Sequence, residues 1–179
     1  MRKTKKIELN IGIPKTGWLP IEFKSGEFEL NFTTSKIPEN PTDKMCDALI
    51  LCLKGVEVEF RWNLEPDIYF FKLTPIGNLI KLSISESNGS EIQNLIYEFS
   101  GDFNSVILPM YRSLKKFSTL EFEKADWKKI DQSKLDKLTE LVTDKKKLLT
   151  TQCISYGLFS PTWKILRIFL WQVSVWNVT

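Results

Sequence analysis

The 179-residue sequence contains no histidine. Histidine is the usual general base near neutral pH, the commonest metal ligand in proteins and the partner of serine and cysteine nucleophiles. Its absence excludes most hydrolase and metalloenzyme designs, although catalysis by a pair of carboxylates needs no imidazole. The composition therefore favours a binding protein over an enzyme.

Cysteine is also scarce, with Cys46, Cys52 and Cys153 as the whole set. An odd number of cysteines without C-x-x-C spacing predicts neither a disulfide framework nor a metal site, and we expect reduced, buried thiols. The sequence lacks the glycine-rich nucleotide loops, the EF-hand pattern and the G-x-S-x-G nucleophile motif as well. We expect no cofactor and no bound metal.

Long hydrophobic runs are missing. In the most apolar stretch, residues 151–179, the apolar side chains crowd into the sixteen positions 163–178 and are interrupted by Lys164 and Arg167. This run is shorter than the run of about 20 apolar residues that crosses a bilayer. The basic N-terminus leads straight into an alternating pattern, without the apolar core of a secretory signal. The sequence thus predicts no transmembrane span and a cytoplasmic location.

The remaining composition is that of an ordinary folded domain. Hydrophobic residues make up 42% of the chain and charged residues 26%, close to the averages for globular proteins. A chain of this length has room for one domain with a substantial core. We expect a single α+β domain over residues 1–150, followed by the apolar segment 151–179.

Alternation of apolar and polar residues, the period of a half-buried strand, recurs along the chain. It predicts strands over residues 7–13, 19–23, 28–32, 56–62, 68–73, 79–85 and 92–99. Ser25-Gly26 supplies a tight hairpin turn between the second and third strands. The short turns between the last four strands predict a meander.

Helical spacing of apolar residues appears in three places, at residues 40–55, 103–117 and 131–147. Asn40 is expected to cap the first helix, Pro41 suits its first position, and Gly55 suits its end. Pro109 is expected to kink the second helix or to delay its regular part. The fold class is therefore α+β: a meandering, mainly antiparallel sheet of about seven strands with two or three helices packed on one side.

The C-terminal segment 151–179 differs from the rest because tryptophan and aliphatic residues crowd it. Residues 173–178 alternate, which predicts an added strand. An interaction tail that mediates homo-oligomerisation and an interfacial amphipathic segment are the alternatives.

Charge is distributed unevenly along the chain. Residues 20–70 hold ten acids and five bases, whereas residues 112–147 hold eleven bases and seven acids. Because acids are interleaved with the lysines of the second stretch, nucleic-acid binding is the least favoured function. The acidic stretch supplies the candidate partner-binding residues, which are expected on strand and helix surfaces: Glu27, Glu29, Asp43, Asp47, Glu57, Glu59 and Arg61.

The order of elements resembles that of small bacterial α+β proteins of the toxin-immunity type. The resemblance spans about residues 7–145 and depends on three segments, 17–20 (GWLP), 37–41 (IPENP) and 62–67 (WNLEPD). It implies a non-catalytic protein-binding module whose acidic surface steers toward a basic protein toxin and blocks it. No site residue follows from the resemblance itself.

A second interpretation places a small-molecule site inside the curved sheet. Such a pocket would be lined by Phe60, Trp62, Phe70 and Tyr97. It would bind a small ligand or support a carboxylate-dependent enzyme, for which Glu57 and Glu59 have suitable strand spacing.

Overall fold

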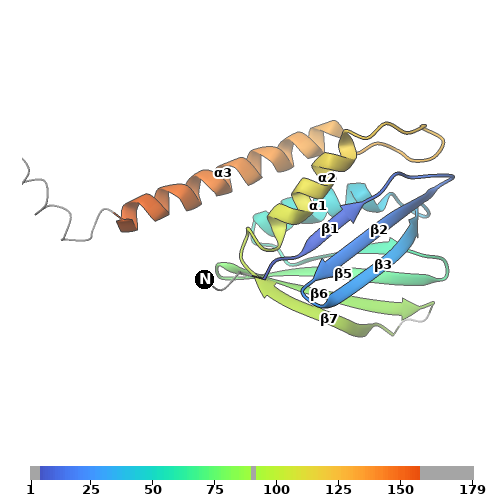
Figure 1. Cartoon of the computed structure of the whole chain (residues 1–179), viewed down its shortest axis with the longest axis horizontal. Helices are drawn as coiled ribbons and strands as arrows, with labels where there is room; N and C mark the ends of the chain where they lie inside the picture. Colours follow the sequence, from blue (N-terminus) through green and yellow to red (C-terminus); the bar gives the residue numbers. More distant parts are fainter. Residues whose placement is uncertain (1–4, 90–91, 158–179) are drawn as a thin grey trace, which may run out of the picture. The chain divides into compact units, whose positions relative to one another are not determined.

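The computed structural model describes residues 5–89 and 92–157, and of residues 152–157 the backbone alone. Seven antiparallel strands lie in the order in which they occur in the sequence (Figure 1). They are β1 (Glu8–Ile11), β2 (Trp18–Ser25), β3 (Phe28–Ser35), β4 (Val58–Asn63), β5 (Asp67–Ile76), β6 (Leu79–Asn88) and β7 (Asn94–Gly101). The three helices are α1 (Pro41–Leu53), α2 (Ile107–Ser118) and α3 (Gln132–Gly157). Helix α1 packs against β4, and α2 packs against β1. The predicted α+β class and the meander are confirmed.

The sheet bends sharply between β3 and β4, because these two strands share one paired position, Ser35 with Asn63. The bend brings the front strands β1–β3 across the face of β4–β7 (Figure 1). Phe23 on β2 consequently packs edge-on against Phe71 on β5, with ring centroids 5.7 Å apart. Burial of large aromatic rings between the two halves supplies much of the hydrophobic stabilisation.

Helix α1 begins and ends as its sequence predicts. The Asn40 side chain accepts a hydrogen bond from the Thr42 N–H at 3.1 Å, and Pro41 occupies the first turn, where a missing N–H costs nothing. At the other end Gly55 has a φ of +85°, a conformation that glycine adopts without strain. Two backbone hydrogen bonds close the helix end in a Schellman arrangement, Gly55 N–H to Cys52 O and Val56 N–H to Leu51 O.

The regular part of α2 begins at Ile107, so Pro109 lies in its first turn and leaves no broken hydrogen bond inside the helix. The expected delay is therefore observed. The apolar side chains of α2, among them Met110, Leu114 and Phe117, are fully buried. Helix α3 extends ten residues further than the expected end at Lys147, to Gly157.

The chain divides into two compact units, residues 1–142 and 143–179. The described part of the second unit is the C-terminal portion of α3, and the strand expected at residues 173–178 lies outside the described residues. No helix in the described ranges has both the length and the hydropathy required to cross a membrane.

Cys46 and Cys52 are buried free thiols on α1, as expected, and the Cys153 side chain lies outside the described residues. Burial raises the pKa of Cys46 to about 12 and that of Cys52 to about 11. Both therefore stay protonated at neutral pH, where the thiolate needed for nucleophilic or redox chemistry is absent.

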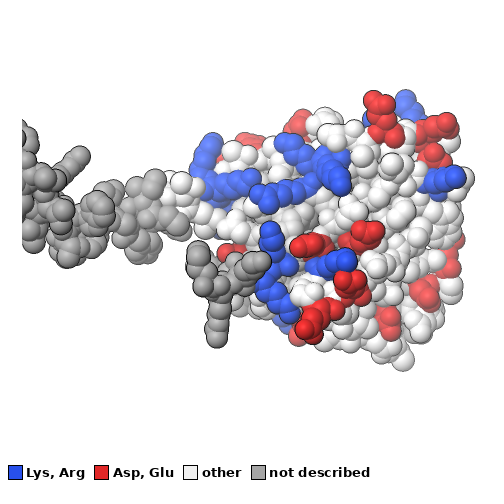
Figure 2. Space-filling model, viewed as in Figure 1, with Lys and Arg blue, Asp and Glu red and all other residues white. Residues whose placement is uncertain are grey.

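Acidic and basic side chains alternate over the strands, while basic ones gather over α2 (Figure 2). Two acids of residues 20–70 pair with bases from outside that stretch: Glu57 with Lys72 at 2.7 Å and Asp47 with Lys134 at 2.6 Å. The excess of acids along residues 20–70 is thus partly neutralised in the folded protein.

Candidate functional site

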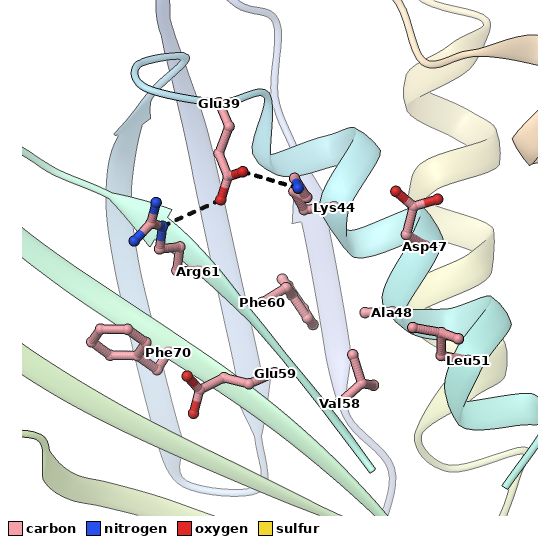
Figure 3. A pocket seen from close by; sticks show the side chains of 10 residues that line it. All are labelled: Glu39, Lys44, Asp47, Ala48, Leu51, Val58, Glu59, Phe60, Arg61 and Phe70. Atoms are coloured by element: carbon pink, nitrogen blue, oxygen red, sulfur yellow. Dashed lines mark ion pairs between the residues drawn. The ribbon is translucent and has the colours of Figure 1, made fainter. Parts of the chain in front are cut away.

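An open pocket of about 350 Å³ lies where α1 passes over β4 (Figure 3). It combines charged side chains with apolar ones. The charged members are Glu39, Lys44, Asp47, Glu59 and Arg61, and the apolar members are Ala48, Leu51, Val58, Phe60 and Phe70. Three of the predicted partner-binding residues, Asp47, Glu59 and Arg61, therefore meet in one place, and we call this the α1–β4 pocket.

The Glu39 carboxylate joins the two elements that form the pocket. One oxygen lies 3.0 Å from Lys44 Nζ on α1 and the other lies 3.3 Å from Arg61 Nε on β4. The hydrogen bond from Lys44 and the nearby Arg61 charge lower the pKa of Glu39. Glu39 is therefore an anion at neutral pH, and it suits a fixed electrostatic role better than proton transfer.

The Nε atom of Arg61 is buried and has no hydrogen-bond partner of good geometry within the described residues. The Nε–H is not aimed at the Glu39 oxygen, so the 3.3 Å contact is an ion pair without a directed hydrogen bond. In Figure 3 the two terminal nitrogens lie on the far side of the guanidinium from Glu39. A guanidinium carries five N–H donors in a fixed fork, so Arg61 keeps donors available for a bound group.

Glu59 also keeps its binding capacity. Its carboxylate forms no hydrogen bond and no ion pair with any described residue. The nearest strand partner in register, Lys72, is paired instead with Glu57, at 2.7 Å. The pocket thus presents the unpaired Glu59 carboxylate and the terminal nitrogens of Arg61 beside the half-buried ring of Phe70.

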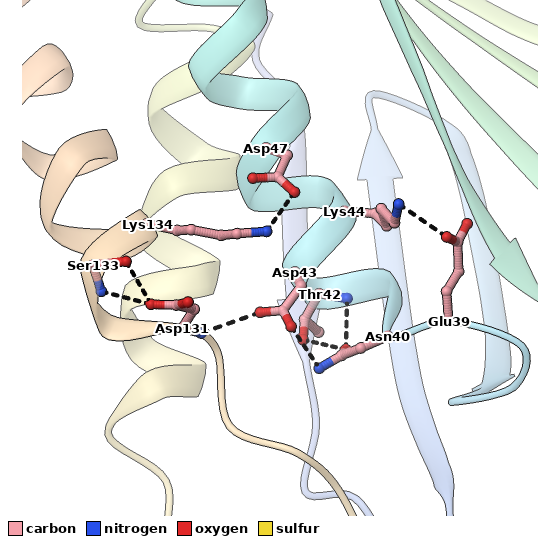
Figure 4. Close-up of polar contacts among 9 residues, drawn as sticks. All are labelled: Glu39, Asn40, Thr42, Asp43, Lys44, Asp47, Asp131, Ser133 and Lys134. Carbon is pink, nitrogen blue, oxygen red and sulfur yellow. Dashed lines mark hydrogen bonds and ion pairs between the residues drawn. The ribbon is translucent and has the colours of Figure 1, made fainter.

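Asp43 and Asp47 have partners inside the protein (Figure 4). Asp43 accepts the backbone N–H of Asp131 at 3.2 Å, and Asp47 pairs with Lys134 at 2.6 Å. Both aspartates therefore attach the start of α3, or the residue just before it, to helix α1. Their expected binding to a partner would require them to give up or share these contacts.

The other predicted acids lie apart from the pocket lining. Glu27 is exposed in the turn between β2 and β3, and Glu29 follows on β3 with its Lys24 partner. Glu57 precedes β4 and binds both Lys72 and the Thr74 hydroxyl, the latter at 2.8 Å. These three remain candidate partner-binding residues, but the structure does not bring them into the α1–β4 pocket.

Sequence reasoning missed Glu39, Lys44 and Phe70 as charged or partner-facing members of this pocket. Glu39 and Lys44 flank the helix cap at Asn40, which the sequence predicted, but the contact between Glu39 and Arg61 on β4 depends on the assembled fold. Phe70 was expected inside the sheet, yet it lies beside Arg61 in register and shares that residue's face.

Of the four aromatic residues expected to line an interior pocket, Phe60 and Phe70 line the open α1–β4 pocket, whereas Trp62 and Tyr97 do not. Trp62 is fully buried and packs against Phe32, Phe60 and Phe71, with centroids 5.8–6.2 Å apart. Tyr97 stacks on Phe28 at 4.2 Å in another part of the core. Because consecutive strand residues alternate in direction, Phe70 points away from the face that Trp62 and its partner Tyr69 share.

Among the described residues, no group of three or more histidine, cysteine, aspartate and glutamate side chains is placed to hold a metal ion. No family model, curated protein or solved structure matches the chain. The site is therefore interpreted from its own geometry.

Proposed function

We propose that this protein is a non-catalytic binding module that holds another protein at the α1–β4 pocket. The observation that carries the proposal is that two charged groups lie there with few partners among the described residues. The exposed Glu59 carboxylate has no ion pair or hydrogen bond, and the buried Nε of Arg61 has only the ion pair with Glu39. A partner can therefore form charge-assisted hydrogen bonds with these groups without first breaking a hydrogen bond of Glu59 inside this protein.

The composition of the pocket supports a protein partner. Arginine and aromatic residues dominate the energetic centres of protein interfaces, and Arg61 and Phe70 lie side by side in strand register. Leu51, 40% exposed on α1, adds apolar surface at the pocket wall. The pocket therefore has the mixed character of an interface centre, with an apolar floor and a polar rim.

The partner that we propose is a basic protein toxin, blocked when a lysine or arginine of the toxin pairs with Glu59. Two arguments support this class: the resemblance to immunity proteins, and the position of Glu59 as the uncommitted acid of the pocket. Complementary charge accelerates encounter between such partners and excludes partners of the same charge.

Capture from host lysate tests the proposal. The tagged full-length chain is compared with Glu59→Lys, and with Glu140→Lys as a control, since Glu140 is an exposed acid on α3 outside the pocket lining. We expect the wild type and the control to retain one basic protein, identified by mass spectrometry. The amount of this protein that Glu59→Lys retains should be at least about tenfold lower than for the wild type.

Expression of the recovered protein then tests neutralisation. Its expression should arrest growth, and co-expression of the wild type or of Glu140→Lys should restore growth while Glu59→Lys should not. Equal rescue by all three proteins would contradict the assignment of Glu59, and a recovered partner without toxicity would contradict the toxin class.

A further inference from the structure

A second concave surface lies between β1 and α2 and has the opposite charge. This groove, of about 290 Å³, is lined by Lys6, Ile7, Glu8, Leu9, Asn10, Pro109, Arg112, Ser113 and Lys116. Three bases and one acid give it a net charge of +2. It lies in the region where basic side chains gather over α2 in Figure 2.

The bases of the groove are available to a ligand. Lys6 and Arg112 form no ion pair and no hydrogen bond with any described residue. Lys116 donates to the Asn10 side-chain oxygen at 3.3 Å, a contact that positions its ammonium group without neutralising it. The one acid, Glu8, lies opposite Lys24 in register, and the two charges attract each other.

The buried hydroxyl of Ser113 is a second indication of a ligand site, independent of the charge of the groove. This residue is 6% exposed, lines the groove, and its hydroxyl is buried without a hydrogen-bond partner. A buried hydroxyl that lacks a partner is destabilising, so such groups are rare in folded proteins and call for an explanation. Because less than 1 Å² of the Ser113 oxygen is exposed, a ligand oxygen in the groove supplies the missing acceptor after a covering side chain moves aside.

We propose that the groove between β1 and α2 binds a phosphate group carried by a small molecule. A phosphate monoester is a dianion near neutral pH, which matches the net charge of +2, and its oxygens accept hydrogen bonds from several directions. Arg112 offers a guanidinium fork, Lys6 and Lys116 offer ammonium groups, and Ser113 offers a hydroxyl. The groove volume of about 290 Å³ lies just below the range of about 300–1,000 Å³ for ligand pockets, so it suits a phosphate with a small substituent.

The test is a titration of the isotope-labelled full-length chain with inorganic phosphate at low ionic strength, followed by NMR. We expect saturable shifts in resonances of α2 and β1. Arg112→Gln should weaken binding about tenfold or more, because charge-assisted hydrogen bonds are lost, and Ser113→Ala should weaken it about fivefold. Lys115→Gln removes a neighbouring charge that does not line the groove, and it should change affinity less than about twofold.

A stability measurement separates a ligand role for Ser113 from a structural one. Ser113→Ala removes an unpartnered buried hydroxyl, so the variant should unfold at an equal or higher temperature while it binds phosphate more weakly. Circular dichroism confirms that each variant is folded. Unchanged affinity in Ser113→Ala, or equal losses in Arg112→Gln and Lys115→Gln, would overturn the proposal, as would the absence of saturable binding by the wild type.

Two further titrations distinguish the source of the phosphate. A nucleoside monophosphate that binds tighter than inorganic phosphate indicates a free metabolite, whereas vesicles that contain phosphatidic acid and sediment with the wild type but not with Arg112→Gln indicate a lipid headgroup. Loss of binding by Glu59→Lys is not expected in any of these titrations, because Glu59 lines the α1–β4 pocket and not this groove.

Discussion

Lys134 Nζ on α3 lies 2.6 Å from the carboxylate of Asp47 on α1. An acid that the sequence predicts to bind another protein is therefore paired with a lysine of the same chain. The hydrogen bond to Asp47 raises the pKa of Lys134, which keeps the ammonium charged through the physiological range. Together with the contact between Asp43 and the backbone of Asp131, this ion pair connects the start of α3 to α1.

Asp47→Asn should have a small effect on stability. Both side chains of the pair are more than one third exposed, and exposed ion pairs contribute about 0–1 kcal/mol. We expect a loss below about 1 kcal/mol in the free energy of urea unfolding, and less in high salt. A loss above about 2 kcal/mol would show that the pair has a larger structural role than its exposure indicates.

The aromatic core should be far more sensitive than the pocket. Phe71 is fully buried against Phe23, Phe60 and Trp62, so Phe71→Ala should cost about 3–5 kcal/mol. Phe70 is its neighbour on the other face and is half-buried, so Phe70→Ala should cost less than about 2 kcal/mol.

Chemical denaturation of both variants, with Phe71→Leu as a milder core change, provides the comparison. If Phe71→Ala does not fold, Phe71→Leu should still unfold at a lower denaturant concentration than Phe70→Ala. The reverse order would show that the two faces of β5 have been assigned incorrectly.

Glu39 should make stability depend on pH. Its pKa is lowered in the folded protein, so in the acid range the unfolded chain binds a proton at this position before the folded one does. The resulting stabilisation is present above the ordinary carboxyl pKa of about 4.3 and is lost as the pH falls through the lowered value.

Glu39→Gln should therefore reduce the loss of stability between neutral and acid pH. The unfolding midpoint in urea, measured across this range, should fall less steeply for Glu39→Gln than for the wild type. Glu140→Gln, which removes an exposed acid from α3, should follow the wild type. Identical pH curves for the wild type and Glu39→Gln would show that Lys44 and Arg61 do not stabilise the Glu39 anion.

Local patterns predicted the elements of this fold because each pattern has a direct physical cause. Alternation along β2 follows from side chains that point in turn to opposite faces, and Leu19, Ile21 and Phe23 are buried as it requires. Asn40 and Gly55 predicted the ends of α1 because capping involves residues close in the sequence.

What the sequence could not predict depends on distant residues. The single paired position between β3 and β4 sets the bend that brings Phe23 onto Phe71, and no local pattern encodes it. The pairing of Asp47 with Lys134 joins positions 87 residues apart. Three of the seven predicted binding residues meet in the α1–β4 pocket, and alternation along β4 accounts for two of them, Glu59 and Arg61. Which predicted acids would pair with bases of the same chain could be seen only in the assembled fold.

The most direct test of the central proposal is the association rate constant between this protein and the basic protein that it retains from lysate, measured at several salt concentrations. If Glu59 receives a basic side chain, Glu59→Lys should lower the rate about tenfold or more at low salt, and the difference should shrink as salt screens the charges. Glu57→Lys should have a smaller effect because Glu57 is already paired with Lys72. Equal association rates for the wild type and Glu59→Lys at low salt would contradict the assignment of the α1–β4 pocket as the binding site.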